Sequence, residues 1–341
     1  MTKPKIIVSV INDLSTDQRV DKICNTLLEL NFDVLLVGRV LPYSKKIDRT
    51  YQTKRFKLWF NKGPLFYANY NIRLFLFLLF TKSDVLWSND LDTLWANYNI
   101  SKWKNKKLIF DSHEYFTEVP ELINRPKVQQ FWKRIERNIL PNLKHVITVS
   151  QSIANLYEKE YNIKVQLLRN VPTLKKQKIA VKNIKSDGKK IIIYQGAINM
   201  NRGIEQMVEA MQEINNAILY ILGKGDISNQ IEALILKLNL SAKVKMLGAI
   251  PLEKLHKYTQ QADLGLSLEE DKGLNYRFAL PNKLFDYIHA GIPVLVANLP
   301  EMKNLVLHYQ IGEVIKNHNP KHIAEKIYSM FQNDTQMQTW R

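Results

Sequence analysis

The chain has 341 residues, which suits two domains of ordinary size better than one core. With 45% hydrophobic and 24% charged residues it is a globular rather than a disordered chain. A single cysteine, Cys24, excludes a disulfide framework and a cysteine metal site and indicates a reducing compartment.

Short apolar runs alternate with segments of helical apolar spacing through residues 1–170, which we expect to form the first domain. Strands separated by helices pair in parallel through right-handed crossovers, and short apolar runs fit a sheet covered on both faces. The predicted elements are strands at Ile6–Val10, Asp33–Val37, Asp84–Trp87, Leu108–Phe110, His145–Val149 and Val165–Leu168, with helices at Arg19–Leu30, through Phe131–Leu140 and from Ser152.

The alternation of strand-like and helical segments stops over residues 171–189. These residues include many lysines, have no long apolar period and are predicted to be a linker. A second domain of the same kind is expected over 190–341, so the fold class is α/β with two doubly wound halves whose facing carboxyl edges form a central cleft. Its predicted strands are Ile191–Tyr194, Ala217–Leu222, Val244–Leu247, Leu264–Leu268 and a run from Pro293; its helices are Gly203–Ile214, Ile231–Leu238, Leu252–Gln261, Asn282–Ala290 and a first turn at Thr335–Arg341.

The segment 267–297 is the most informative part of the chain. A loop leads to Pro281 and Asn282 at the predicted start of a short helix, and Gly291 follows its end. The amides of such a helix start favour a phosphate. Asp286 lies one turn further, where a carboxylate accepts hydrogen bonds from a ribose diol. The segment therefore predicts a nucleotide site.

Two further strand ends in the second half carry glycines. Gly196 leaves the first strand, and Arg202 precedes the next helix, where a guanidinium fork suits a diphosphate. The alternative for Arg202 is an exposed side chain that is mildly unfavourable at a helix start. Gly223 and Gly225 follow the next strand and permit close approach of a nucleotide, although glycine ends many strands.

In the first half, His113 and Glu114 follow a strand, and a histidine beside carboxylates there suits a sugar hydroxyl or a proton transfer. The alternative is a loop histidine with internal partners. The Asn89–Asp92 stretch contains an Asp-x-Asp pair, which we interpret as the N-cap of the next helix rather than a metal site. Arg19 follows a turn without dinucleotide-fingerprint glycines, and either faces the cleft or is structural.

The formal net charge of +17 predicts a polyanionic partner, unless it reflects a lysine-rich composition alone. No nucleic-acid-binding signature is present and the cations are scattered, which leaves anionic lipid or phosphorylated substrates. The aromatic segment Lys57–Lys82 is interpreted either as a membrane-interface segment or as a core helix with a loop. No apolar run reaches the roughly 20 residues of a membrane span. The start lacks a signal-peptide core, so we expect a cytoplasmic protein, soluble or peripheral at the inner face of the plasma membrane.

These motifs resemble, in order and spacing, the retaining GT-B glycosyltransferases of family 4, and the resemblance covers nearly the whole chain. It runs through DSHEYF, HVITVSQSI, YQGAINMNRG, LYILGKGD and VKMLGAIP to PNKLFDYIHAGIPVLVA. It implies two Rossmann-like domains, with the acceptor on the first and the donor on the second. It also implies a nucleotide-diphosphate sugar as co-substrate, no cofactor or metal, and a glycan or lipid-linked acceptor in surface polysaccharide synthesis. In that family a last helix returns to the first domain, of which the closing segment would be the start.

The resemblance also implies roles for particular residues. Asp286 matches the second of two family glutamates, which binds the ribose, whereas Phe278 stands at the first; Glu269, Glu270 and Asp271 are candidates to replace it. Ala197 stands where the family has a diphosphate-binding arginine, and Lys283 or Arg277 is expected to substitute. The implied sites are catalytic His113, Arg202 and Lys283; donor-binding Gly196, Arg202, Gly223, Ile250, Pro281, Asn282, Lys283 and Asp286; and acceptor-side Arg19, Asn89, Asp90 and Glu114.

Two other functions are compatible with this architecture. A non-hydrolysing nucleotide-sugar epimerase would need additional carboxylates for proton abstraction. A catalytically weak nucleotide-sugar-binding partner subunit is suggested by Ala197 and Phe278.

Overall fold

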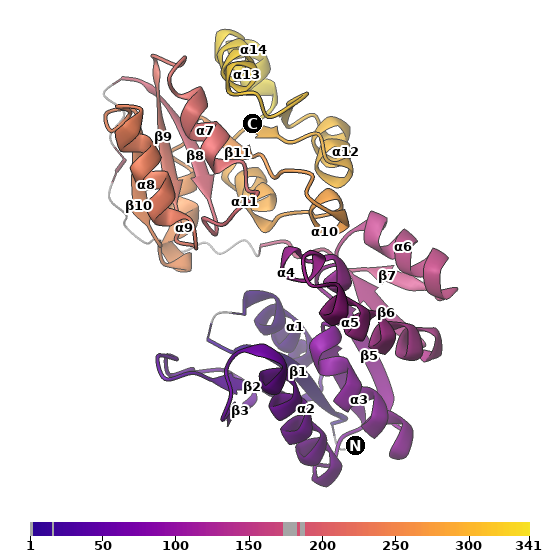
Figure 1. Cartoon of the computed structure of the whole chain (residues 1–341). Coiled ribbons are helices and arrows are strands. Elements are labelled where there is room, and N and C mark those ends of the chain that lie inside the picture. Colours follow the sequence, from indigo (N-terminus) through magenta and orange to yellow (C-terminus); the bar gives the residue numbers. More distant parts are fainter. Residues whose placement is uncertain (1–2, 16, 173–182, 185–187) are drawn as a thin grey trace. The chain divides into compact units, whose positions relative to one another are not determined.

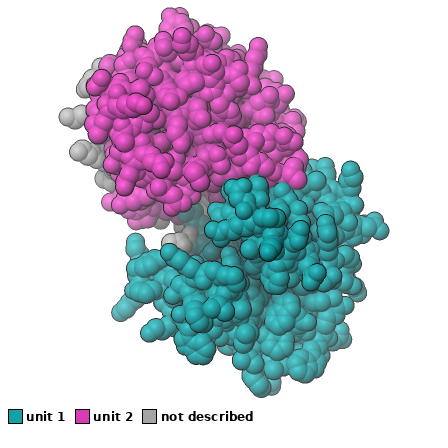
Figure 2. Space-filling view, viewed as in Figure 1, with its two compact units in different colours: residues 1–170 teal, residues 171–341 magenta. Residues whose placement is uncertain are grey.

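A computed structural model describes residues 3–15, 17–172, 183–184 and 188–341. The chain divides into two compact units, residues 1–170 and 171–341 (Figure 2). Most of the predicted linker, residues 173–182 and 185–187, lies outside the described residues.

Unit 1 is built on a seven-stranded sheet with the order β3-β2-β1-β4-β5-β6-β7, in which all neighbours are parallel (Figure 1). Its first six positions have the 3-2-1-4-5-6 order of a doubly wound Rossmann sheet. The strands are β1 (Lys5–Asp13), β2 (Asp33–Val40), β3 (Gln52–Lys57), β4 (Val85–Asn89), β5 (Lys107–Ser112), β6 (His145–Thr148) and β7 (Val165–Leu167). The helices are α1 (Gln18–Glu29), α2 (Gly63–Phe80), α3 (Leu91–Trp103), α4 (Pro120–Ile123), α5 (Pro126–Ile139) and α6 (Gln151–Tyr161), with 3₁₀ turns at Phe116–Glu118 and Leu140–Asn142.

The aromatic segment Lys57–Lys82 contains α2, a helix of 18 residues. One face of α2 is buried, and the Tyr70 hydroxyl donates to the β1 carbonyl of Val10 at 2.7 Å. Helix α1 packs with β1 and β2 in a separate cluster that contains Val8, Ile23 and Leu36. The core-helix interpretation of the segment is therefore correct for the inner face of α2.

Unit 2 repeats the arrangement in a six-stranded sheet of order β10-β9-β8-β11-β12-β13, also parallel throughout. The strands are β8 (Lys190–Gln195), β9 (Ala217–Leu222), β10 (Val244–Gly248), β11 (Leu264–Ser267), β12 (Val294–Val296) and β13 (Gly312–Val314). The helices are α7 (Ile204–Ala210), α8 (Ser228–Lys237), α9 (Leu252–Thr259), α10 (Leu274–Arg277), α11 (Asn282–Ala290), α12 (Pro300–Tyr309), α13 (Pro320–Gln332) and α14 (Asp334–Thr339).

The β8 sequence explains why this sheet is covered on both faces. Ile192 and Tyr194 pack in one cluster with α7, α8 and α13, whereas Ile191 and Ile193 pack in another with α11 and α12. Side chains alternate across a strand, so an uninterrupted apolar run supplies both clusters. Both units are thus Rossmann-like, as predicted. In each, strand order reverses beside the first strand, and the carboxyl ends there are the usual place for a ligand.

Candidate active site

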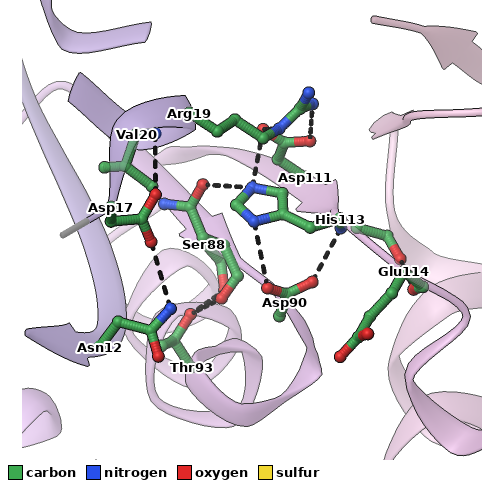
Figure 3. A network of polar contacts seen from close by, with 12 residues as sticks. Asn12, Asp17, Arg19, Val20, Ser88, Asp90, Thr93, Asp111, His113 and Glu114 are labelled. Atoms are coloured by element: carbon green, nitrogen blue, oxygen red, sulfur yellow. Dashed lines mark hydrogen bonds and ion pairs between the residues drawn. The ribbon is translucent and has the colours of Figure 1, made fainter. Parts of the chain in front are cut away.

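His113 follows β5 at the carboxyl edge of the unit 1 sheet and is surrounded by hydrogen-bond acceptors (Figure 3). Its Nδ1 lies 3.2 Å from Asp90 Oδ2, and its backbone N–H donates to Asp90 Oδ1 at 2.8 Å. Its Nε2 lies 3.0 Å from Asn89 Oδ1 and 3.3 Å from Asp111 Oδ2. The Asn89 amide donates to the Ser9 carbonyl at 2.9 Å, which fixes Oδ1 toward the ring. Among the residues that the structure describes, both ring nitrogens therefore face acceptors.

Two acceptors on opposite sides of an imidazole require a proton on each nitrogen. Although burial acts in the opposite direction, the carboxylates of Asp90 and Asp111 raise the pKa of His113 to about 9. His113 is thus an imidazolium near neutral pH and cannot take up a proton in this state. Its positive charge is balanced within the network by the carboxylates of Asp90 and Asp111.

Arg19 lies in the same network. Its Nε and Nη2 donate to the two oxygens of Asp111, at 3.3 and 2.6 Å, and its Nη1 donates to the Leu168 carbonyl at 2.9 Å. Asp111 is completely buried and Arg19 is 7% exposed. Burial acts against ionisation of Asp111, but His113 and Arg19 lower the pKa of this carboxyl. The predicted acceptor-side Arg19 is therefore held inside unit 1.

Asp90 occupies the N-cap position of α3, as predicted, but its side chain makes no capping bond to a residue that the structure describes. Its backbone has φ +56°, a strained conformation for a residue with a side chain. In this conformation the Asp90 carboxylate contacts His113. Within the described ranges, no group of three His, Cys, Asp or Glu side chains is arranged for a metal ion. The Glu114 side chain extends away from the His113 ring (Figure 3).

Two glycines bring strand ends of unit 2 into close contact. Gly223, after β9, has φ +152°, and a Cβ there would lie 1.8 Å from the Gly196 carbonyl oxygen. Gly196, after β8, has φ +136°, and a Cβ there would be in ordinary contact with the Lys283 side chain, 3.4 Å from its Cε. Only glycine fits both positions. The two predicted glycines thus define a backbone surface over which Lys283 lies.

Two cations meet one buried carboxylate beside these glycines. Lys283 Nζ, from α11, lies 2.7 Å from Glu269 Oε1 and 4.1 Å from the centroid of the Tyr194 ring. Arg202 Nη1 lies 3.6 Å from the same oxygen, and the guanidinium stacks 5.2 Å from the Tyr276 ring. Although burial opposes it, the two cations lower the pKa of Glu269. Lys283, Arg202 and Glu269 together carry one net positive charge.

The two candidate replacements for the missing cation differ in position. Arg277 is half exposed and forms a bidentate pair with Asp271, with the shortest bond at 2.7 Å. Lys283, in contrast, lies over Gly196, next to Ala197. Of the three acidic candidates for the position of Phe278, Glu269 binds Lys283, Glu270 lies near Lys272, and Asp271 binds Arg277.

Helix α11 has the predicted bounds, with Pro281 at its N-cap position and Gly291 in the left-handed conformation after its end. No side chain of a described residue caps its start. One turn on, Asp286 Oδ2 accepts a 2.8 Å bond from Gln195 Nε2, and Thr259 orients the same amide through a 2.6 Å bond. Ile250, in the loop after β10, packs partly buried against the apolar cluster of α11 and α12.

Unit 2 therefore offers a cation pair, a glycine-lined backbone surface and a helix N-terminus at one sheet edge, a combination that binds phosphoryl groups. With a Rossmann-like fold in both units, these features define a protein of the GT-B class.

Two family models bear this out. The model of the glycosyl transferases group 1 matches residues 175–341, and that of glycosyltransferase family 4 matches residues 17–173. Because the two models together account for nearly the whole chain, the protein belongs to these glycosyltransferases.

Sequence relatives are distant and partial. An uncharacterised glycosyltransferase of Methanocaldococcus jannaschii is 29% identical over 143 residues, which are 40% of this chain and 35% of that protein. The chitobiosyldiphosphodolichol beta-mannosyltransferase of Candida albicans is 24% identical over 260 residues, 68% of this chain and 56% of that protein. The chain thus matches about a third to just over half of the length of these relatives.

Solved structures share the fold over almost the whole chain. Sucrose-phosphate synthase of Thermosynechococcus elongatus superposes with a TM-score of 0.81 at 17% identity, covering 99% of this chain and 92% of that one. The HepE protein of Anabaena, solved in complex with UDP-glucose, gives a TM-score of 0.71 at 14% identity, covering 98% and 92%.

Proposed function

We propose that the protein transfers a sugar, with retention at the anomeric carbon, from a nucleotide-diphosphate sugar to a hydroxyl of a glycan or lipid-linked acceptor. We place this reaction in surface polysaccharide synthesis. The observation that carries the proposal is the buried Glu269 that gathers Lys283 and Arg202 beside Gly196. The HepE complex with UDP-glucose supports the donor class, because its fold is similar.

In the proposed reaction the bond from the anomeric carbon to the diphosphate breaks, and a bond to the acceptor oxygen forms on the same face. Charge grows on the departing phosphate, and Lys283, Arg202 and the start of α11 stabilise it there. The departing phosphate takes the acceptor proton. His113 is not the base, because hydrogen-bond acceptors lie beside both of its ring nitrogens and its pKa is raised to about 9.

We further propose that these protein cations take the part that a divalent metal plays in other transferases. Activity is then expected to survive chelation with EDTA. Loss of activity that returns with added magnesium or manganese would contradict this part of the proposal.

The remaining roles follow from position in the chain. Asp286 binds the ribose diol with the oxygen geometry that Gln195 sets, and Pro281, Asn282, Gly223 and Ile250 line the nucleotide. On unit 1 we assign the acceptor to the carboxyl edge around Asn89, Asp90 and Glu114.

The test is thermal stabilisation by a panel of nucleotides and nucleotide sugars. A rise in melting temperature with one nucleoside diphosphate is expected, and it should be absent in Arg202→Ala and Asp286→Ala. Arg277→Ala is the matched control, because Arg277 is an exposed arginine paired with Asp271 alone in the described ranges. No shift with any member of the panel would contradict the donor site.

Product analysis then separates the alternatives. Transfer of labelled sugar with the donor's anomeric configuration, read by NMR, supports the proposal. Interconversion of donor epimers without an acceptor would indicate the epimerase. Donor binding without transfer or hydrolysis would indicate the partner subunit.

A further inference from the structure

Helix α2 of unit 1 is apolar on the side that faces away from the core. Its buried side chains are Phe66, Tyr70, Leu74 and Leu78. On the opposite side Leu65, Ile72, Leu76 and Phe80 are 58%, 56%, 49% and 83% exposed. Surface helices of globular proteins usually carry polar residues on the outer face. The only charged side chain in the 18 residues of α2 is Arg73.

Helix α3 extends this apolar surface. Helices α2 and α3 lie side by side (Figure 1). The ring of Phe75 lies 5.8 Å from that of Trp95 and 6.4 Å from that of Trp103, which is 70% exposed. Lys104 Nζ donates to the Leu78 carbonyl at 3.0 Å and ties the ends of the two helices together. We call this surface the α2–α3 face; it consists of Leu65, Ile72, Phe75, Leu76, Phe80, Trp95 and Trp103.

The second observation is the charge of the surrounding sequence. Residues 57–83 and 93–110 contain no Asp or Glu. The same two segments contain eight cations, namely Lys57, Lys62, Arg73, Lys82, Lys102, Lys104, Lys106 and Lys107. An exposed apolar face on two segments whose only charged residues are cations fits an occupant that is apolar inside and anionic at its surface.

This charge distribution distinguishes a lipid surface from a second copy of the chain. In a two-fold symmetric dimer the same patch meets itself, which would bring the cations of one copy near those of the other. An anionic bilayer instead accepts the apolar side chains below its headgroups and the lysines at headgroup level, and indole rings favour that boundary. None of the helices that the structure describes could itself cross a bilayer.

We propose that the α2–α3 face docks on an anionic phospholipid bilayer, with α2 lying in the plane of the interface. The 18 residues of α2 give a contact about 27 Å long. The exposed side chains enter the headgroup–acyl boundary, and each well-placed lysine adds about 1 kcal/mol of attraction. This inference goes beyond the transfer reaction, since it depends on no donor-site residue.

Vesicle flotation with the full chain tests the proposal independently of catalysis. Wild-type protein is expected to float with vesicles of equal parts phosphatidylglycerol and phosphatidylcholine, and at least about tenfold less with pure phosphatidylcholine. The triple variant Ile72→Glu, Leu76→Glu, Phe80→Glu should lose at least about tenfold in partitioning to the anionic vesicles. Leu236→Glu, at a 68% exposed leucine on α8, is the control and should float like wild type.

A second readout needs no disruptive variant. Brominated acyl chains should quench the tryptophan fluorescence of bound protein, and quenching should fall when Trp95 and Trp103 are replaced by phenylalanine. Equal flotation of wild type and the triple variant would overturn the proposal, as would equal flotation with both vesicle types. A wild-type dimer in sedimentation velocity that the triple variant lacks, without vesicle binding, would instead identify a second copy as the occupant.

Discussion

Glu269 and Lys283 form a buried ion pair in unit 2, with 2.7 Å between Oε1 and Nζ and both side chains less than a tenth exposed. Arg202 approaches the same oxygen of Glu269, so the ion pair is part of a cluster with a second cation. The buried carboxylate lies between two cations and holds them in place. It thereby acts as a positioning residue for the proposed donor site.

Replacing Glu269 should therefore lower the stability of the protein. Glu269→Gln leaves Lys283 buried without its counter-ion, and we expect the free energy of unfolding to fall by about 3 kcal/mol. Urea denaturation measures this fall in the free energy of unfolding. Saturating nucleoside diphosphate should restore more stability to this variant than to wild type. Glu270→Gln is the control, since the cation paired with it, Lys272, is exposed, and it should change stability by less than about 1 kcal/mol. Equal losses in the two variants would refute this role.

The pH dependence of stability should report the charge on His113. The pKa of His113 is raised to about 9 in the folded protein, above the ordinary value of 6.5 that applies to the unfolded chain. Protonated His113 therefore stabilises the fold fully below pH 6.5, and this contribution is lost as pH rises through about 9. The difference corresponds to about 3 kcal/mol.

Denaturation curves from pH 6 to 10 measure this loss, and His113→Gln should flatten it. His145→Gln, which changes an exposed histidine of the same unit, should keep the wild-type pH dependence. An NMR titration that places the His113 ring near its ordinary pKa would count against the imidazolium.

Arg19 should prove structural and coupled to Asp111. Arg19→Met removes one of the two cations that face the fully buried Asp111 carboxylate. We therefore expect the free energy of unfolding to fall by about 3 kcal/mol. Asp111→Asn should cost a similar amount. Because the two residues act together, the double variant should lose much less than the sum of the single losses. Additive losses in such a double-mutant cycle would show that the pair is not coupled.

The contact between Gly223 and Gly196 should tolerate no side chain. Gly223→Ala places a Cβ at 1.8 Å from a carbonyl oxygen, so a backbone must move. Gly63→Ala is a matched control, because Gly63 also has a positive φ but no atom of a described residue lies within 4 Å of the added Cβ. The first variant should lose at least about 2 kcal/mol more than the second in urea denaturation. It should also lose the nucleotide-induced thermal shift, which the control keeps.

Sequence patterns predicted most of the sheet strands, because buried parallel strands are short apolar runs. Strand β3 was missed, since QTKRFK lies at the sheet edge and is largely exposed. Helix α7 is shorter than the predicted Gly203–Ile214 and ends at Ala210. Nothing was predicted between β12 and the closing turn, although Ile323, Ile327 and Met330 repeat at helical spacing in α13. This spacing is a sequence signal from which α13 could have been predicted.

The site was predictable in its positions but not in its pairings. Glycines and the start of α11 are local signals, so Gly196, Gly223 and Pro281 could be found from sequence. The attachment of Lys283 and Arg202 to Glu269, or of Asp90 to His113, depends on side chains brought together by the fold. No local pattern encodes it. The same holds for Gln195, whose contact with Asp286 spans 91 positions.

The order Arg19, Asp111, His113, Asp90 is a row of alternating charges in which each member touches the next. Its sum is zero, so no single position can be exchanged for a neutral residue without leaving a charge uncompensated in the interior. Evolution must therefore alter such a row in pairs. Among descendants of this chain, positions 19 and 111 should change together, and so should positions 90 and 113, which makes the row an inherited unit rather than four separate residues.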